Sequence, residues 1–232
     1  MSGLDELKEY HDKHKQEMKV FLQECVKRGK SEDPMELFKW LCKNLLASRA
    51  TWEKASQAVE YLSKSNCLYC GSVASIENDL RKCGYGSLNN KNKAQWILKA
   101  RELLYDKGSE IGIVYFVHML DLQCDEDPLK VRNLLADTTT DNHISGLGMK
   151  EASHFLRGLG FSHNKLAILD SVVLRQLVYI GVINNSPNNP TKNTYLSIEN
   201  EVKGWWAENT ICIPLDGVDW LLWRMGRNDS NV

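Results

Sequence analysis

The sequence is poor in proline and glycine and has no long apolar run. Its 232 residues include 5 Pro and 15 Gly, which excludes a collagen-like fibre or a low-complexity chain. No apolar segment reaches the roughly 18–20 residues that a membrane-spanning helix needs, so we expect no membrane partner. Because the first thirty residues are rich in charge, we also expect no signal peptide. These absences favour a protein of the cytoplasm or nucleoid, or of the nucleus in a eukaryote.

An excess of either charge is also absent. The chain has 29 Lys and Arg against 30 Asp and Glu, with a formal net charge of −1. This excludes a uniformly basic, histone-like surface, so any binding of nucleic acid must use a local patch. Residues 81–101 contain a candidate patch, because they include basic residues and no Asp or Glu, with a solvated basic face as the alternative. Its members are Arg81, Lys82, Lys91, Lys93, Lys99 and Arg101.

The cysteines do not form a recognisable framework. Their number, 7, is odd, so reduced thiols are expected rather than a set of disulfides. Cys67 and Cys70 have the spacing of half a zinc site, but no second pair follows to complete four ligands. We therefore predict no metal site and interpret these two residues as packed or surface thiols.

Helical periodicity runs through most of the chain, and alternating strand patterns are scarce. We therefore predict an all-α fold of two helical lobes with a groove between them. One lobe combines residues 1–30 with 190–232, and the other comprises residues 31–189. Pro34 and Pro128 each follow an Asp, which is typical of a helix start. Further helices are predicted from residue 51 and over 76–83, 94–104, 149–159, 171–179, 194–206 and 218–225.

The most informative stretch is residues 143–159, a predicted helix-hairpin-helix motif that contains the run Gly-Leu-Gly-Met-Lys. Gly146 and Gly148 lie between two predicted helices, where positive φ and the missing Cβ let the backbone approach a partner. The helix that follows presents free N–H groups at its start, a favourable site for a phosphate. A plain turn between helices is the alternative interpretation.

Lys150 and Asp170 are the candidate reactive groups. Lys150 shares with His154 and Arg157 the helix face opposite the apolar residues. A helix dipole disfavours a positive charge in the first turn, which favours a functional amine at Lys150. Asp170 ends the apolar run 166–169 and is placed to cap the next helix. A carboxylate at the rim of a dry pocket would also stabilise a developing sugar cation.

The run from Gly146 to Arg157, followed by residues 166–170, resembles the helix-hairpin-helix DNA glycosylases. Within them it is most similar to the type 2 8-oxoguanine DNA glycosylases of archaea and some bacteria. The resemblance implies a bifunctional glycosylase and AP lyase of base excision repair. It implies that Lys150 attacks C1′ of the flipped nucleotide and forms a Schiff base, that Asp170 stabilises the cationic sugar, and that β-elimination nicks the strand.

The resemblance also implies the partners and cofactors. The substrate is double-stranded DNA that contains 8-oxoguanine, and the protein is expected to be a monomer. No organic cofactor is needed, and a monovalent cation is expected at the hairpin. Gly146 and Gly148 would bind a DNA phosphate through main-chain N–H groups, with His154 and Arg157 as further phosphate-binding residues.

Three more residues are assigned by the resemblance. Arg49 would be the DNA wedge that fills the gap left by the flipped base, with a surface arginine as the alternative. Trp223 would stack on the damaged base, with a plain core residue as the alternative, and the terminal Val232 would reach the base through its carboxylate. Two positions depart from the family pattern: the usual terminal Lys is Val232, so a side-chain contact to the base is lost, and the usual phosphate-binding His two positions after the aspartate is Val172.

Two alternative functions stay open. The same mechanism would serve another oxidised base or an abasic site. A helix-hairpin-helix module that binds DNA phosphates without catalysis would need neither Lys150 nor Asp170, so their coexistence argues against it. A metal-dependent hydrolase built on Cys67 and Cys70 lacks a ligand set in the sequence.

Overall fold

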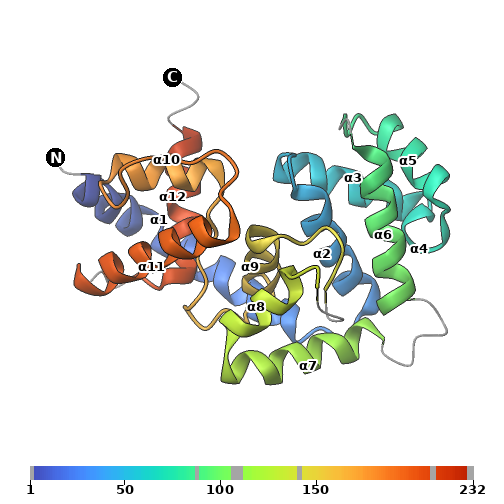
Figure 1. Cartoon of the computed structure of the whole chain (residues 1–232), viewed down its shortest axis with the longest axis horizontal. Coiled ribbons are helices and arrows are strands. Elements are labelled where there is room, and N and C mark those ends of the chain that lie inside the picture. The colour runs from blue at the N-terminus through green and yellow to red at the C-terminus, as the bar shows by residue number, and fades with distance from the viewer. Residues whose placement is uncertain (1–2, 87–88, 106–111, 140–142, 210–212, 229–232) are drawn as a thin grey trace.

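The computed structural model describes residues 3–86, 89–105, 112–139, 143–209 and 213–228, and these residues form helices and loops without a strand (Figure 1). The predicted all-α class is confirmed. The helices are α1 (Gly3–Gly29), α2 (Pro34–Ala47), α3 (Trp52–Lys64), α4 (Cys67–Cys70), α5 (Val73–Lys82), α6 (Asn90–Leu104), α7 (Ile113–Glu126), α8 (Pro128–Ala136), α9 (Met149–Arg157), α10 (Ser171–Tyr179), α11 (Lys192–Glu208) and α12 (Leu215–Asn228).

Local hydrogen bonds explain where several helices begin. The Asp33 carboxylate accepts from Met35 N at 2.9 Å, directly before the first-turn proline of α2. Asp127 caps α8 in the same way and accepts from two backbone N–H groups, at 3.0 and 3.1 Å. Such caps satisfy N–H groups that have no partner within the helix. The predicted starts at Pro34 and Pro128 are confirmed.

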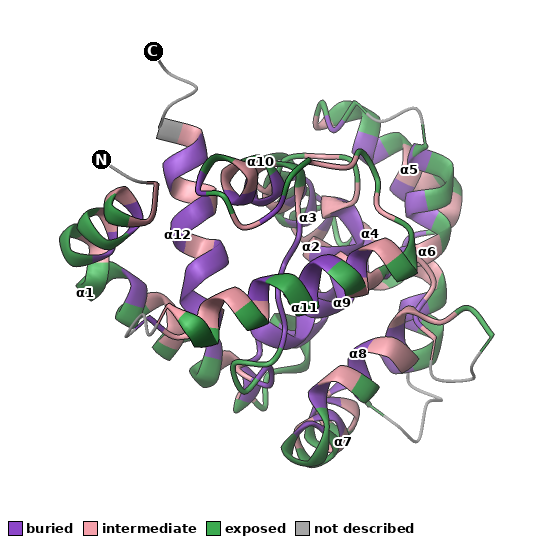
Figure 2. Cartoon of the chain, turned by 60° about the vertical axis from the view of Figure 1, so that its left-hand side comes forward, coloured by how far each residue is buried: buried purple, intermediate pink, exposed green. Residues whose placement is uncertain are grey.

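Two hydrophobic cores divide the described chain. The first is built from α2 to α9 and extends to Leu166, and the second is built from α1, Ala167, Leu169 and α10 to α12. The cores therefore divide between residues 166 and 167, whereas the sequence placed the lobe boundary at 189–190. The reason is α10, whose apolar side chains Val173 and Leu174 join the core around α12 rather than the first core. Figure 2 shows that α12 is buried along most of its length.

Helix α1 extends from the second core to the first (Figure 1). Leu7 and Met18 belong to the second core. At the other end, Arg28 donates to the Gly158 carbonyl at 2.6 Å. A Cβ on Gly29 would lie 2.0 Å from the Leu159 carbonyl oxygen, so glycine alone permits this approach. A long helix thus connects both cores by packing rather than by a flexible linker.

Helix α7 is one of the helices that sequence periodicity did not predict. Its first turns are the β-branched and aromatic run 113–117, which has low intrinsic helix propensity. Packing on α2 and α8 therefore decides its helical state. Among the described residues, no helix combines the length and apolar character required to cross a bilayer.

Candidate active site

The turn before α9 is a tight hairpin. Leu147 N donates to the Ile144 carbonyl at 3.0 Å, which closes the turn. Gly146 has φ of +98°, and a Cβ there would lie 2.6 Å from the Trp96 ring. Gly148 has an extended backbone with φ of −89°, so positive φ, predicted as available to both glycines, is used at Gly146 alone. As the N-cap of α9, Gly148 offers no side chain to the first-turn N–H groups, which favours an anion from outside the chain.

Lys150 is the second residue of α9, directly beyond this hairpin. Its side chain is 32% exposed, and its Nζ lies 3.1 Å from the Glu151 carboxylate. Glu151 is a site residue that the sequence analysis missed, although its position next to the lysine was the available signal. The pair places an amine and a buried carboxylate at the start of one helix.

Asp170 is the N-cap of α10, as predicted. Its carboxylate accepts from Val172 N at 2.9 Å and from Val173 N at 2.8 Å. The preceding residues 166–169 are buried and apolar, whereas Asp170 is half-buried. Two backbone donors therefore hold a carboxylate at the edge of an apolar segment, which suits it to face a developing positive charge.

A buried polar network joins α9 to the segment that precedes Asp170. Arg132 on α8 is fully buried and pairs with Glu199 of α11 at 2.9 Å. Arg132 also donates to Ser153 Oγ on α9 at 3.2 Å, and Glu199 accepts from Ala167 N at 2.9 Å. Tyr195 donates to the Ala167 carbonyl at 2.6 Å. Since Ser153 lies about one turn after Lys150 and Ala167 lies three residues before Asp170, the network connects the supports of both reactive groups.

Lys150 lies on a helix that contacts both cores, and Asp170 lies at the edge of the second. Met149, just before Lys150, packs against the second core, whereas Ala152 on the same helix belongs to the first. Asp170 directly follows Leu169 of the second core.

His154 faces inward from α9. Its ring stacks on Trp40 and meets Trp52 edge-on, with centroids 5.7 and 4.7 Å away, and its Nδ1 lies 2.7 Å from Asn44 Oδ1. Burial lowers the pKa of His154 well below its usual range, and the charges of nearby cations lower it further. The imidazole is therefore neutral and packed among aromatic rings.

Arg157 is also buried. It pairs with Asp219 at 2.9 Å and donates to the Asp216 carbonyl at 3.0 Å. The sequence placed His154 and Arg157 with Lys150 on the helix face opposite the apolar residues. Arg157 is instead buried, and His154 is half-buried against Trp40 and Trp52. Their geometry gives no support to the predicted phosphate-binding role.

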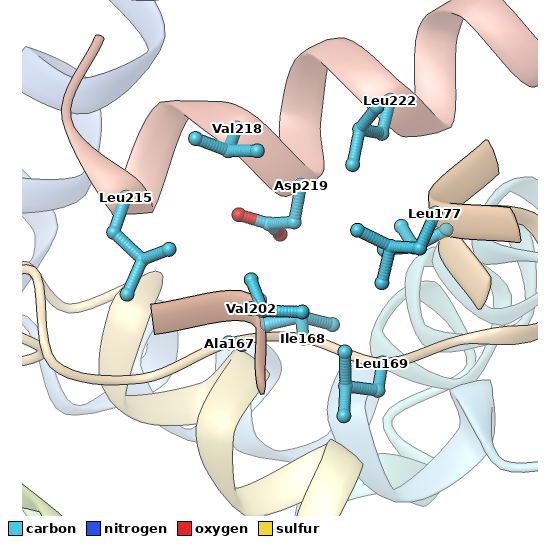
Figure 3. Close-up of a pocket in the computed structure, with 10 residues that line it drawn as sticks. Ala167, Ile168, Leu169, Leu177, Val202, Leu215, Val218, Asp219 and Leu222 are labelled. Atoms are coloured by element: carbon cyan, nitrogen blue, oxygen red, sulfur yellow. The ribbon is translucent and has the colours of Figure 1, made fainter. Parts of the chain in front are cut away.

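Asp219 on α12 lines a small, mostly apolar cavity. Figure 3 shows its carboxylate among aliphatic side chains that include Ile168, Leu177 and Val202. Burial raises the pKa of Asp219, and the Arg157 guanidinium opposes this rise. The ion pair therefore fastens α9 to α12 directly behind the segment that leads to Asp170.

Arg49 and Trp223 lie on opposite sides of the core junction. Arg49 is exposed in the turn between α2 and α3, with φ of +60°, which is uncommon for a residue other than glycine. Trp223 is half-buried on α12, and the Arg227 guanidinium lies 4.4 Å from its ring. Arg227 also pairs with Glu53 of α3 at 2.6 Å, which connects the helices of the two cores. Val232 lies outside the described residues.

The basic run 81–101 is only partly a surface patch. Lys93 and Arg101 are buried, so the prediction is wrong for these two residues. Arg81 pairs with Glu77, and Lys82 lies 3.6 Å from Asp79. Lys91 and Lys99 are also exposed. The phosphate-facing charge of this region is therefore smaller than the composition indicates.

Cys67 and Cys70 are free thiols in the structure. Cys70 Sγ donates to the Asn66 carbonyl at 3.3 Å. The part of the chain that the structure describes contains no group of three His, Cys, Asp or Glu side chains arranged to hold a metal ion. These cysteines therefore contribute no ligand set to the candidate site.

Comparison with known proteins points to one family. A family model described as 8-oxoguanine DNA glycosylase matches residues 18–211. The 8-oxoguanine DNA glycosylase/AP lyase of Fusobacterium nucleatum is 32% identical over 169 residues, which are 73% of this chain and 70% of the relative. The protein of the same name from Saccharolobus solfataricus is 32% identical over 192 residues, 82% of each chain.

Solved structures share the fold. The Methanocaldococcus jannaschii 8-oxoguanine glycosylase/lyase, in complex with a 15mer DNA that contains 8-oxoguanine, matches with a TM-score of 0.75 at 24% identity over 97% of each chain. The 8-oxoguanine DNA glycosylase of Thermotoga maritima matches with a TM-score of 0.74 at 24% identity, over 96% of this chain and 94% of that one. The overall fold of this chain is therefore similar to the folds of these two solved structures.

Proposed function

This chain belongs to the 8-oxoguanine DNA glycosylase family, and we propose from that premise that it excises 8-oxoguanine from double-stranded DNA and then nicks the strand. The observation that carries the proposal is the position of Lys150, on the first turn of α9 directly beyond a glycine hairpin without a capping side chain. A phosphate bound at that hairpin would bring the deoxyribose near the amine.

In this proposal Lys150 is the nucleophile. The Lys150 ammonium first gives a proton to a carboxylate, a role we assign to Asp170; the neutral amine then forms a bond to C1′ of the everted nucleotide while the glycosidic C–N bond breaks, and the released base takes up that proton. Opening of the sugar ring leaves a Schiff base between Lys150 and C1′. Loss of a proton from C2′ then expels the 3′ phosphate by β-elimination, and hydrolysis of the Schiff base restores the amine.

Asp170 would stabilise the sugar during this exchange. Positive charge develops at C1′ and the ring oxygen as the base departs, and a carboxylate already held by two backbone donors needs little reorganisation to face it. Glu151, in contact with the Lys150 ammonium, would hold the amine in place until the substrate arrives. This chemistry calls for no organic cofactor, and a monovalent cation at the hairpin stays a prediction of the family resemblance.

Substrate binding is assigned to the residues around these two groups. Gly146 and Gly148 would approach a DNA phosphate, Arg49 would enter the gap in the duplex, and Trp223 would stack on the everted base, which is worth roughly 1–3 kcal/mol for stacking of a base on an aromatic ring. Arg227 currently covers one face of Trp223 and would have to move or share the ring. We expect the protein to act as a monomer.

Borohydride trapping on a duplex with 8-oxoguanine opposite cytosine tests the proposal. Wild type should form a covalent adduct, and Lys150→Gln should form none. Asp170→Asn keeps a good N-cap and should slow base release by roughly a hundredfold or more. An adduct that persists in Lys150→Gln would overturn the assignment of the nucleophile. Competition with duplexes that carry an oxidised pyrimidine or an abasic site separates the alternative substrates.

A further inference from the structure

Lys93 is a buried lysine that the proposed chemistry does not use. It lies on α6 with 3% of its surface exposed. Its Nζ donates to the Leu45 carbonyl at 2.7 Å and to the Ser48 carbonyl at 2.9 Å. These carbonyls lie at the end of α2, whose last turn contains no basic residue of its own. Lys93 therefore supplies, from another helix, donors that the end of α2 lacks.

The turn that Lys93 holds is the turn of Arg49. Ser48 directly precedes Arg49, whose positive φ is unfavourable for a residue other than glycine and persists only where the surroundings enforce it. Tyr85 adds a second support, because its hydroxyl donates to the Leu46 carbonyl. The end of α2 is thus fastened from one side by Lys93 and from another by Tyr85.

The same part of α6 also touches the hairpin. The Lys93 Nζ lies 4.6 Å from the centre of the Trp96 ring, one turn further along the helix. The Trp96 ring in turn packs so closely on Gly146 that a Cβ there would lie 2.6 Å from it. A chain of direct contacts therefore runs from Ser48 through Lys93 and Trp96 to Gly146.

The charged groups around Lys93 agree with its position between the Arg49 turn and the hairpin. Burial lowers the pKa of Lys93 to about 8, the Glu151 carboxylate opposes this change, and the positive charges of Lys150 and Arg49 add to it. The groups that influence Lys93 are therefore the candidate nucleophile, its carboxylate partner and the candidate wedge. Lys93 itself is not placed to react, because two carbonyls and the Trp96 ring surround its amine.

We propose that Lys93 is a positioning residue that holds the Arg49 turn and the catalytic hairpin in a fixed relation, so that a base displaced by Arg49 brings its C1′ to Lys150. This inference rests on the proposed function and deepens it. It assigns to Lys93 no part in bond breaking. Its loss should therefore harm excision of a stacked, paired base much more than reaction at a sugar that carries no base.

The test compares two substrates in four proteins: wild type, Lys93→Met, Lys93→Arg and Tyr85→Phe. Single-turnover excision is measured on a duplex with 8-oxoguanine opposite cytosine, and borohydride trapping is measured on the same duplex with an abasic site. Lys93→Met keeps the volume of the side chain and removes its donors. We expect it to slow excision by about tenfold or more while it changes abasic-site trapping by less than about threefold.

The other two variants are controls for a merely structural effect. Lys93→Arg keeps donors for the two carbonyls and should restore most of the excision rate. Tyr85→Phe removes a hydrogen bond to the same helix end and leaves both Lys93 bonds in place, so it should slow excision much less than Lys93→Met does. Equal losses on both substrates in Lys93→Met, or no loss on either, would overturn the inference. Thermal denaturation of each variant identifies a protein that fails to fold; if Lys93→Met does, Lys93→Gln, whose amide is too short to reach both carbonyls, takes its place with the same expected losses.

A binding measurement separates this inference from the proposed function. In the Lys150→Gln background, 2-aminopurine beside the lesion reports unstacking by its fluorescence, and no chemistry is required. Adding Lys93→Met should reduce that signal at saturating protein. If wild type forms no adduct but this signal still depends on Lys93, the proposed function fails and the positioning role stands. If wild type is active and the signal is independent of Lys93, the inference fails alone.

Discussion

Two lysines in this protein acquire different roles from their surroundings. Lys150 is partly exposed at a helix start and contacts a carboxylate, so its amine can reach a substrate. Lys93 is buried and donates to two carbonyls, so its amine supports the backbone. The side-chain chemistry is the same in both cases. The difference lies in access to solvent and in whether the bonded partner can be exchanged for a ligand.

His154 provides a pH-dependent prediction at the residue scale. In the unfolded chain it takes up a proton below about pH 6.5, whereas burial keeps it neutral in the folded protein. The unfolded state therefore binds more protons in acid, and the free energy of unfolding should fall by up to about 1.4 kcal/mol per pH unit below pH 6.5. Chemical denaturation near neutral pH and in mild acid should show this fall in wild type and a smaller one in His154→Gln.

His118 offers the matched control for this measurement. It is exposed on α7, so His118→Gln should leave the slope of stability against pH unchanged. A wild-type slope that survives in His154→Gln would contradict the assignment of the effect to the buried ring.

Helix α9 is the element on which the site depends most. Its first residues continue the hairpin, Ser153 joins the buried network, and Arg157 pairs with Asp219 of α12. Each of these contacts reaches a different element, so the direction of Lys150 is set by three attachments. This explains why a nine-residue helix holds its orientation at the junction of two cores.

Removal of the Arg132–Glu199 pair tests how much the contact between α8 and α11 stabilises the fold. Both side chains are almost fully buried, and breaking such a pair from one side typically costs about 3–5 kcal/mol. We expect Arg132→Met to lower the free energy of unfolding by an amount near the lower end of this range, because Glu199 stays buried with only Lys203, 3.5 Å away, as its remaining cationic partner. The double variant Arg132→Met with Glu199→Leu should recover part of the loss. Urea denaturation gives the values.

A surface pair serves as the comparison. Lys192 and Asp137 are 3.3 Å apart with both side chains substantially exposed. Lys192→Met should therefore change stability by no more than about 1 kcal/mol. Equal losses of unfolding free energy in Lys192→Met and Arg132→Met would contradict the larger contribution to stability that we assign to the buried pair.

At the scale of the whole molecule, the chain is nearly neutral and its two cores meet at the site. The Arg227–Glu53 pair crosses this junction between α12 and α3, beside Trp223. Since both side chains are partly exposed, the pair adds little to stability. Its effect should instead appear in DNA binding. Glu53 places a negative charge near the proposed DNA-binding residues, and it occupies the Arg227 guanidinium, which would otherwise donate to a DNA phosphate.

We expect Glu53→Gln to tighten binding to an abasic-site duplex several-fold at low salt, with the gain fading as the ionic strength rises. Fluorescence anisotropy at several salt concentrations measures this. Glu17→Gln makes the same change of charge in a pair with Arg224, also on α12, and should have a smaller effect. An equal gain in both variants would indicate a response to net charge rather than to the Glu53 contact.

The sequence alone determined the features that arise from neighbours along the chain. Asp33, Asp127 and Asp170 cap helices through bonds that span two or three residues, so residue type and order suffice to predict them. The same holds for the Gly146 turn and for Lys150 directly behind it. These local patterns were the basis for predicting the all-α class and for the family resemblance.

The tertiary structure decided what depends on partners distant in the sequence. From the sequence alone, Arg157 is predicted to lie opposite the apolar face of its helix. In the structure it is buried against Asp219 of α12, 62 residues away. From the sequence alone, Lys93 is predicted to belong to a basic patch. In the structure α6 packs on the end of α2, and Lys93 donates to Ser48, 45 residues away in the sequence. The lobe boundary likewise follows from α10 packing on α12. Burial and pairing are properties of the assembled cores, because helical periodicity shows which face is apolar but not which helix covers it.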